Sequence, residues 1–120
     1  MDWDPLGELL ATGTFDGTAR IWDRHGSLKS TLHGHTGPIF SMQWNKSGTA
    51  LLSGSMDKSA IVWDPSSGAA KQRFNFHTEP TLDVDWRDDS TFATCSSDKF
   101  IHVCEVGAQK PVKTFASNGA

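Results

Sequence analysis

A histidine, a serine, an aspartate and a tryptophan follow one another in the middle of the chain at spacings that could assemble a polar network. They are His35, Ser53 or Ser55, Asp57 and Trp63. An imidazole N–H can donate to a carboxylate, and the bond is charge-assisted if the ring is protonated. A buried indole N–H needs an acceptor, which either serine hydroxyl could supply. The spacing does not decide between Ser53 and Ser55.

The same residue types form the catalytic triad of serine hydrolases. Repetition argues against that chemistry, because the aspartate and tryptophan recur at Asp16 and Trp22 and would demand a triad in every copy. We therefore interpret these residues as a structural network. We expect no enzymatic activity, no cofactor and no small-molecule substrate.

The last third of the chain departs from this pattern. His77 and Asp98 remain, but Cys104 occupies the position that Trp63 has in the preceding copy. We expect the histidine and aspartate to pair there without an indole. This copy should be the least stable of the three.

A zinc site in the same region is a competing interpretation, since His77, Cys95, His102 and Cys104 are all possible ligands. The chain has no Cys-x-x-Cys pair, and neighbouring residues on a strand point to opposite faces. We therefore expect no metal site.

The elements that must position these residues belong to a repeat. Trp22-Asp23 and Trp63-Asp64 lie 41 residues apart, and each tryptophan follows a turn aspartate by six residues. A further tryptophan precedes the aspartate of each copy, at Trp3, Trp44 and Trp86. This period is typical of a β-propeller blade of four strands.

Local patterning indicates short strands. Apolar residues occupy every second position in segments 40–44 and 82–86, which is the period of a strand. Glycine, proline and aspartate clusters separate such segments at regular intervals. The sequence predicts twelve strands in a partial propeller over residues 1–115. The predicted copies span about 1–32, 33–74 and 75–115, and residues 116–120 form an atypical tail.

Composition narrows the function class. The chain has 120 residues and a net charge of −3, with no basic stripe for nucleic acid. No apolar run approaches the ~20 residues of a membrane span. The acidic amino terminus lacks the apolar core of a signal peptide, so we expect a nuclear or cytoplasmic protein with two unpaired cysteines.

Three blades cannot close a ring, because propellers typically have about four to eight. The fold is therefore predicted to be all-β, an incomplete propeller segment of three four-stranded antiparallel blades. We expect the chain to be a segment of a larger protein, and self-assembly of several copies is the alternative. A truncated product with two unpaired blade edges would be unstable alone and have no independent activity.

The chain resembles WD-repeat β-propellers and, more narrowly, the transducin-beta-like, F-box-like/WD-repeat subfamily. The narrower resemblance covers nearly the whole chain, to about Phe115, and includes the cysteine at position 104. It rests on Leu10-Ala-Thr-Gly13, Gly37-Pro-Ile-Phe40, Trp44-Asn-Lys46, Leu82-Asp-Val-Asp-Trp86, Thr91-Phe-Ala-Thr-Cys-Ser96 and Ile101-His-Val-Cys104.

The resemblance implies a nuclear adaptor in a transcriptional corepressor complex that contains a histone deacetylase. It also implies binding of histone tails and a part in ubiquitin-dependent exchange of corepressors. Such a protein would act as an interaction scaffold and would make no direct sequence-specific contact with nucleic acid.

Candidate contact residues precede the turn aspartates at Phe15, Met56 and Ser97. Phe15 is the strongest, because aromatic anchors are frequent hot spots, although these side chains could equally cover the ring's edge. Glu79, Asp83 and Asp85 could attract a basic histone tail, but charged positions on a strand are more often only solvated.

A substrate receptor of a ubiquitin ligase is the alternative function. It would require several arginines in one basic pocket for phosphate recognition. Arg20 could belong to such a pocket, but Arg24, Arg73 and Arg87 share no repeat position.

Overall fold

The computed structural model describes residues 1–116, which form twelve strands and no helix within that range. Ala116 ends the last strand, and the rest of the predicted tail, 117–120, lies outside the described residues. The strands are β1 (Asp2–Trp3), β2 (Leu9–Gly13), β3 (Thr18–Asp23), β4 (Leu28–His33), β5 (Ile39–Trp44), β6 (Leu51–Ser55), β7 (Ala60–Trp63), β8 (Ala70–Phe74), β9 (Thr81–Trp86), β10 (Thr91–Ser96), β11 (Phe100–Glu105) and β12 (Lys113–Ala116).

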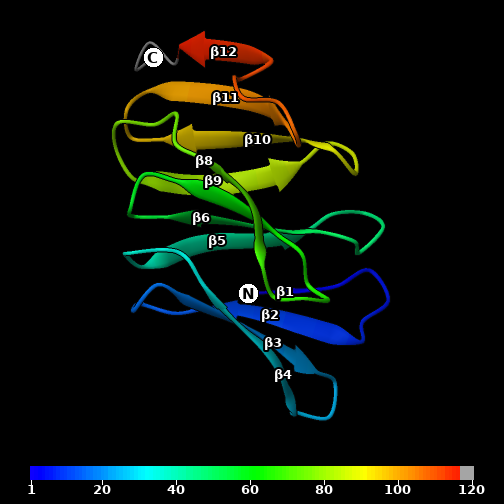
Figure 1. The fold of residues 1–120 in the computed structure, drawn as a ribbon. Coiled ribbons are helices and arrows are strands. Elements are labelled where there is room, and N and C mark those ends of the chain that lie inside the picture. The colour runs from blue at the N-terminus through cyan, green and yellow to red at the C-terminus, as the bar shows by residue number, and fades with distance from the viewer. Residues whose placement is uncertain (117–120) are drawn as a thin grey trace.

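The strands form three four-stranded antiparallel sheets, each a simple meander. We call them blade 1 (β1–β4), blade 2 (β5–β8) and blade 3 (β9–β12). The blades stack face to face in chain order, from the blue end of the chain to the red end (Figure 1). Over residues 1–116 they close no ring. The predicted all-β architecture of three four-stranded blades is confirmed.

Each blade has the same central hairpin, closed by a turn whose third residue is an aspartate. The carboxylate accepts a hydrogen bond from the backbone N–H two residues on, as aspartate does in tight turns. These bonds join Thr18 to Asp16 (3.0 Å), Ser59 to Asp57 (2.9 Å) and Phe100 to Asp98 (2.9 Å). The residue after the aspartate has a positive φ, at Gly17 (85°), Lys58 (76°) and Lys99 (71°).

The core consists of two apolar layers, one between each pair of neighbouring blades. Blade 2 supplies side chains to both layers, and every residue of β6 and β7 is buried. Trp63 and Leu51 face blade 1, whereas Val62 and Leu52 face blade 3. Burial on both faces makes blade 2 the centre of the fold.

Backbone and indole hydrogen bonds repeat at the two blade junctions. Trp44 Nε1 donates to the Asp2 carbonyl (3.1 Å), and its backbone N–H donates to the Asp2 carboxylate (3.0 Å). Trp86 Nε1 donates in the same way to the Gln43 carbonyl (2.9 Å), and its N–H donates to the Gln43 side chain (3.1 Å). These bonds hold the first strands of successive blades side by side.

The predicted alternation fails at the start of two strands. Met42 and Trp44 are buried, but Phe40 is 49% exposed, and its counterpart Leu82 is 47% exposed. The register shifts between Ile39 and Ser41, and again in β9 around Leu82. A β-bulge turns one side chain out of the alternating pattern, so Phe40 and Leu82 do not join the core.

Close approach of blades 1 and 2 yields a stability prediction. A Cβ added at Gly13 would lie 2.6 Å from Ile39 Cγ2, so Gly13→Ala must push the blades apart. We expect a loss of about 1–3 kcal/mol in the free energy of unfolding, measured by urea denaturation.

Gly37→Ala is the matched control, because its added Cβ meets nothing closer than 3.4 Å. Equal losses in the two variants would show that the contact between blades 1 and 2 does not limit stability.

Candidate functional site

Blade 2 holds the predicted polar network as one continuous chain of hydrogen bonds. The Trp63 indole donates to Ser53 Oγ (2.8 Å), which lies 2.6 Å from His35 Nε2. His35 Nδ1 lies 2.8 Å from Asp57 Oδ2. Because Ser53 accepts from the indole, its own proton is free to point to His35 Nε2, and the ring proton on Nδ1 then points to Asp57. These hydrogen bonds link the outer part of blade 2 to the loop that precedes the blade.

The Trp63 indole bonds to Ser53 and not to Ser55. Ser55 has another role, since its hydroxyl lies 3.0 Å from the Gly37 carbonyl and 2.9 Å from the Pro38 carbonyl. It also accepts the Asp57 backbone N–H at 3.1 Å. Ser55 therefore anchors the loop between blades 1 and 2 to the aspartate turn.

Asp57 is the most heavily bonded residue of the network. Its carboxylate accepts from the Thr36 backbone (3.0 Å) and from both the backbone and the hydroxyl of Ser59. Arg73 Nη1 lies 3.7 Å away. Burial raises the pKa of Asp57, but the hydrogen bonds from Ser59, His35 and Thr36 outweigh it and the net pKa is lowered.

Ser53, His35 and Asp57 have the connectivity of a hydrolase triad, but the site cannot act as one. Ser53 has no exposed surface, and its hydroxyl is committed to Trp63 and His35. A nucleophilic serine must reach a substrate carbonyl. The geometry therefore serves packing between the blades.

Blade 1 repeats part of the network. The Trp22 indole donates to Thr12 Oγ1 at 3.0 Å, so a threonine takes the place of Ser53. Asp16 is exposed, and hydrogen bonds from Thr14 and Thr18 lower its pKa.

Blade 3 keeps the histidine and aspartate and loses the indole. His77 Nδ1 lies 2.8 Å from Asp98 Oδ2, and His77 Nε2 lies 2.8 Å from Thr94 Oγ1. Cys104 replaces the tryptophan and packs in the layer between blades 2 and 3. Burial raises the pKa of this thiol to about 12, so it is not a reactive cysteine.

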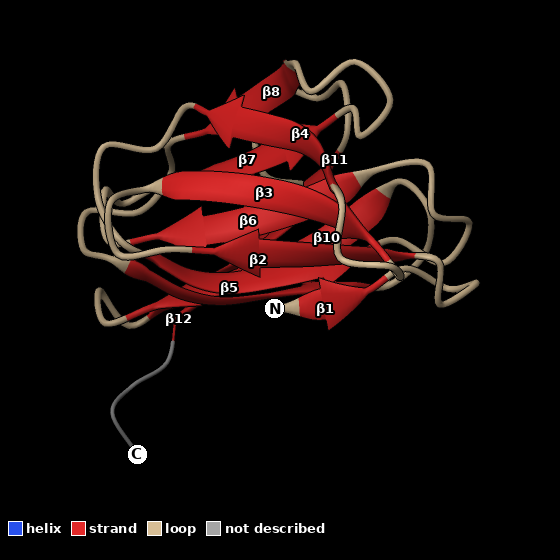
Figure 2. Ribbon diagram, turned by 90° about the horizontal axis from the view of Figure 1, so that it is seen from below, coloured by secondary structure: helices blue, strands red, loops and turns tan. Residues whose placement is uncertain are grey.

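The contact candidates lie at one end of the molecule, which we call the turn face. It carries the turns at 14–17, 56–58 and 97–99 and the loops that lead into β5 and β9, and Figure 2 shows the turns gathered at the two ends of the strands. Phe15 is 87% exposed and Met56 51% exposed. Ser97 is also exposed.

Phe40 and Leu82 add two apolar side chains at the same end, and sequence reasoning missed them. They are the second residues of β5 and β9, beside the loops of the turn face. The sequence signal for this pair was their shared position, four residues before Trp44 and Trp86. An alternating pattern assigns both to the core, because it contains no information about the bulge.

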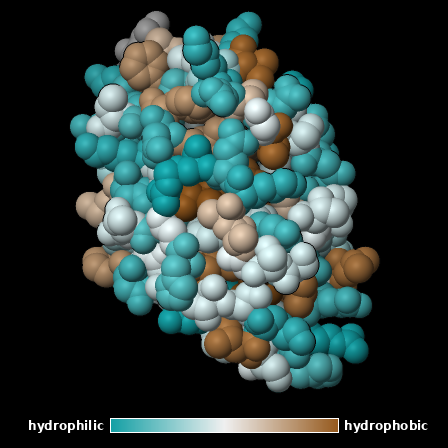
Figure 3. All heavy atoms as spheres, viewed as in Figure 1, coloured by the Kyte–Doolittle hydropathy of each residue, from teal (hydrophilic) through white to brown (hydrophobic). Residues whose placement is uncertain are grey.

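Apolar groups are dispersed over one side of the surface. On the side drawn in Figure 3, brown apolar residues form separate spots among teal and white ones. The exposed aliphatic residues at the opposite end include Leu6 and Leu28. These residues are exposed apolar side chains away from the turn face, so they can serve as controls for it.

Within residues 1–116, Arg20, Arg73 and Arg87 do not gather into a phosphate pocket. Arg20 lies on β3 and faces away from blade 2, because its neighbours Ala19 and Ile21 point into the layer between the blades. Arg73 is bound to the Gly34 carbonyl and to Ser59. Arg87 lies at the other end of the strands, beside Asp88.

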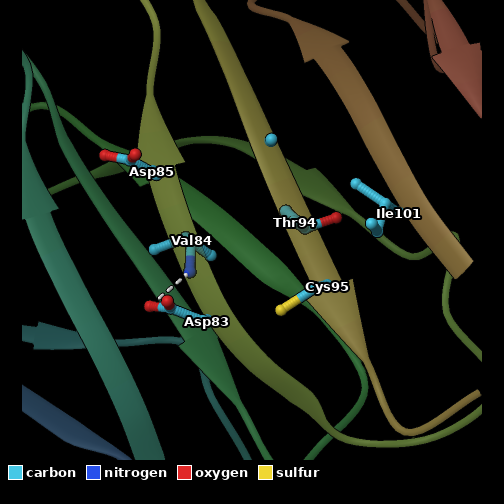
Figure 4. Close-up of a pocket in the computed structure, with 7 residues that line it drawn as sticks. Asp83, Val84, Asp85, Thr94, Cys95 and Ile101 are labelled. Carbon is cyan, nitrogen blue, oxygen red and sulfur yellow. Dashed lines mark hydrogen bonds between the residues drawn. The ribbon is translucent and has the colours of Figure 1, made fainter. Parts of the chain in front are cut away.

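A shallow hollow of about 100 Å³ lies on blade 3, lined by Asp83, Val84, Asp85, Ala93, Thr94, Cys95 and Ile101. Figure 4 shows Asp83 and Asp85 on one strand and Cys95 on the next. Asp83 already accepts from Ser41 Oγ at 2.8 Å. The hollow is open and much smaller than the roughly 300–1,000 Å³ of typical ligand pockets, so it does not suit a small-molecule site.

The repeated blades match a family model described as "WD domain, G-beta repeat" at residues 1–23, 26–64 and 68–105. The chain belongs to the WD-repeat family. The aspartate turns and the indole networks lie within the matched repeats.

Two WD-repeat relatives match almost the whole chain. The F-box-like/WD repeat-containing protein TBL1X of Homo sapiens is 55% identical over 115 residues, which cover 96% of this chain and 20% of the relative. The WD40 repeat-containing protein HOS15 of Arabidopsis thaliana is 60% identical over 118 residues, 98% of this chain and 19% of the relative. The chain spans about a fifth of the length of these relatives.

Solved WD-repeat structures show the same fold. The C-terminal WD40 domain of Sif2 superposes with a TM-score of 0.86 and 31% identity, over 94% of this chain and 32% of that one. The Cps50 (Swd1) β-propeller domain also gives 0.86 at 24% identity, over 96% and 37%. In the part of this chain that the structure describes, no helix is long and apolar enough to cross a membrane.

Unequal aspartate contacts in blades 2 and 3 generate a prediction. Asp57→Ala leaves His35 Nδ1, the Thr36 N–H and Ser59 without their acceptor, and we expect it to cost roughly 1–3 kcal/mol in unfolding free energy. Asp98→Ala should cost less, because the Asp98 carboxylate has no serine partner like Ser59. Both are measured by urea denaturation at pH 7, and equal losses would contradict this account of blade 3.

Because the His35 ring is buried, we expect the protein to lose stability on acidification. Burial lowers the pKa of His35 below 6.5 and outweighs the opposing contribution of Asp57, while Arg73 lowers the pKa further. As pH falls below about 6.5, the unfolded chain takes up a proton that the folded chain resists, so stability falls. We expect the urea midpoint to decrease from pH 7 to pH 5.5.

His35→Gln should reduce this slope, and His33→Gln, at an exposed histidine, should leave it unchanged. An unaltered slope in His35→Gln would mean that another group controls the acid sensitivity.

Proposed function

We propose that this chain is the propeller segment of a nuclear transcriptional corepressor adaptor. In this role it binds corepressor and histone deacetylase subunits and histone tails, and it acts as a scaffold without catalysis. The observation that carries the proposal is the identity of 55–60% across almost the whole chain to F-box-like/WD repeat and HOS15 proteins.

The architecture suits a scaffold. Interlocked blades with two buried layers hold the turns rigidly in place, so little ordering entropy is lost when a partner binds. The buried Ser53–His35–Asp57 chain supplies no accessible nucleophile. Binding to other proteins is the activity that remains for such a surface.

The turn face supports protein contact through apolar anchors. Phe15, Met56, Phe40 and Leu82 are large and exposed. The acidic residues of β9 and its preceding loop, Glu79, Asp83 and Asp85, give blade 3 a negative edge that favours a basic histone tail. Asp85 is the more available of the two aspartates for a partner, because Asp83 already accepts a hydrogen bond from Ser41.

The ubiquitin-ligase alternative has less support from the surface. Phosphate recognition needs several arginines in one pocket, and in residues 1–116 Arg20, Arg73 and Arg87 lie on different parts of the fold.

Affinity capture from nuclear extract tests the proposal. The tagged chain is used as bait, and histone deacetylase and corepressor subunits are quantified by mass spectrometry. Phe15→Ala combined with Met56→Ala should lower their recovery by about tenfold or more, because aromatic and apolar anchors dominate interface energy.

Leu6→Ala combined with Leu28→Ala, at the opposite end, is the matched control and should recover the partners normally. Equal recovery with the turn-face and control baits would exclude the turn face as the contact surface. Absence of corepressor and deacetylase subunits from the unaltered bait would overturn the proposed function.

A further inference from the structure

Blade 3 brings together three metal-ligating side chains, whereas blade 2 has equivalents of only two of them. His77, Asp98 and His102 each offer a ligand atom, and these atoms all lie within 4.8 Å of one another. In blade 2 the position of His102 is taken by Ile61, which packs in the core. The additional histidine therefore converts a two-residue contact into a three-residue cluster.

One atom of this cluster has no hydrogen-bond partner. His102 is only 7% exposed. Within residues 1–116, its Nε2 atom is buried and has neither a donor nor an acceptor. The other ring nitrogen, Nδ1, lies 2.9 Å from Thr114 Oγ1. The Phe76 carbonyl is near enough to favour a charged ring but makes no aligned hydrogen bond. A buried unpartnered nitrogen is costly unless it has a ligand.

The ring of His102 is ready to donate a lone pair. A proton on Nδ1 can be donated to Thr114 Oγ1, and Nε2 then carries the lone pair. The His77 and His102 ring centroids are 4.6 Å apart, so the two rings lie side by side.

We propose that His77, Asp98 and His102 bind one Zn²⁺ ion, with water as the fourth ligand. Two imidazoles and a carboxylate are a donor set that zinc accepts. Tetrahedral bonds of normal length place ligand atoms about 3.3 Å apart. The 2.8 Å between His77 Nδ1 and Asp98 Oδ2 must widen by about half an ångström, and the wider separations must contract.

Neighbouring groups can hold the ligands in place. Asp98 accepts the Phe100 N–H (2.9 Å) and the Thr78 N–H (3.1 Å). When the metal takes His77 Nδ1, the ring proton moves to Nε2, where Thr94 Oγ1 at 2.8 Å can accept it. Hydrogen bonds of this kind orient metal-bound histidines and raise their basicity.

The ion would join three separate parts of blade 3. His77 belongs to the loop before β9, Asp98 to the turn between β10 and β11, and His102 to β11. In blade 2 the Trp63 indole helps to tie the corresponding parts together. Zinc would supply this tie where Cys104 has replaced the indole. The proposal departs from the sequence expectation of no metal site, and it uses neither cysteine.

Direct metal binding tests the site. The purified chain is treated with chelator, titrated with Zn²⁺ by calorimetry, and examined with Co²⁺ as a spectroscopic probe. We expect one ion per chain, a visible absorption band typical of tetrahedral cobalt, and a melting temperature that rises with zinc concentration. Absence of the band and of the melting shift would overturn the proposal.

Variants separate this site from surface histidines. His102→Ile, which copies blade 2, should weaken zinc binding by more than tenfold and abolish the cobalt band. Thr114→Val alters only an exposed side chain, so it should fold, and it should weaken binding by about ten- to a hundredfold. It keeps the test decisive if His102→Ile fails to fold.

The matched control is His25→Gln combined with His33→Gln, at two exposed histidines. This variant should bind zinc as the unaltered chain does. Loss of binding in the control, or unchanged binding in both His102→Ile and Thr114→Val, would overturn the assignment.

Discussion

A four-stranded sheet cannot bury both of its faces alone, and the rest of this structure depends on that constraint. Blade 2 meets it fully, because blades 1 and 3 cover its two sides and leave β6 and β7 without exposed residues. The junctions are held by apolar layers and by indole bonds from Trp44 and Trp86. Packing between blades, rather than any single strand, therefore provides the stability.

The polar networks form their hydrogen bonds within these packed blades. Trp63, Ser53, His35 and Asp57 form a fully bonded chain in blade 2, where a missing partner would leave a buried group unsatisfied. Blade 3 keeps the pair of His77 and Asp98 but lacks the indole. The repeats thus share the order of their four strands but differ in the chemistry at equivalent positions.

The polar networks lie inside the blades, whereas the apolar side chains of the turn face are exposed. The networks hold the loops from within, while side chains such as Phe15 and Phe40 remain exposed at the same end. A rigid frame with variable exposed turns is well suited to binding proteins. The residues with catalytic potential are therefore buried, and the residues proposed for binding are exposed.

The sequence by itself determined the repeat, the twelve strands, the three blades and the residues of the polar networks. These features are local or periodic, so spacing reveals them. Tertiary structure decided the choice of Ser53 over Ser55, the outward position of Phe40, and the meeting of His102 with His77 and Asp98. Each depends on register or a bulge, where a shift of one residue reverses the face of a side chain.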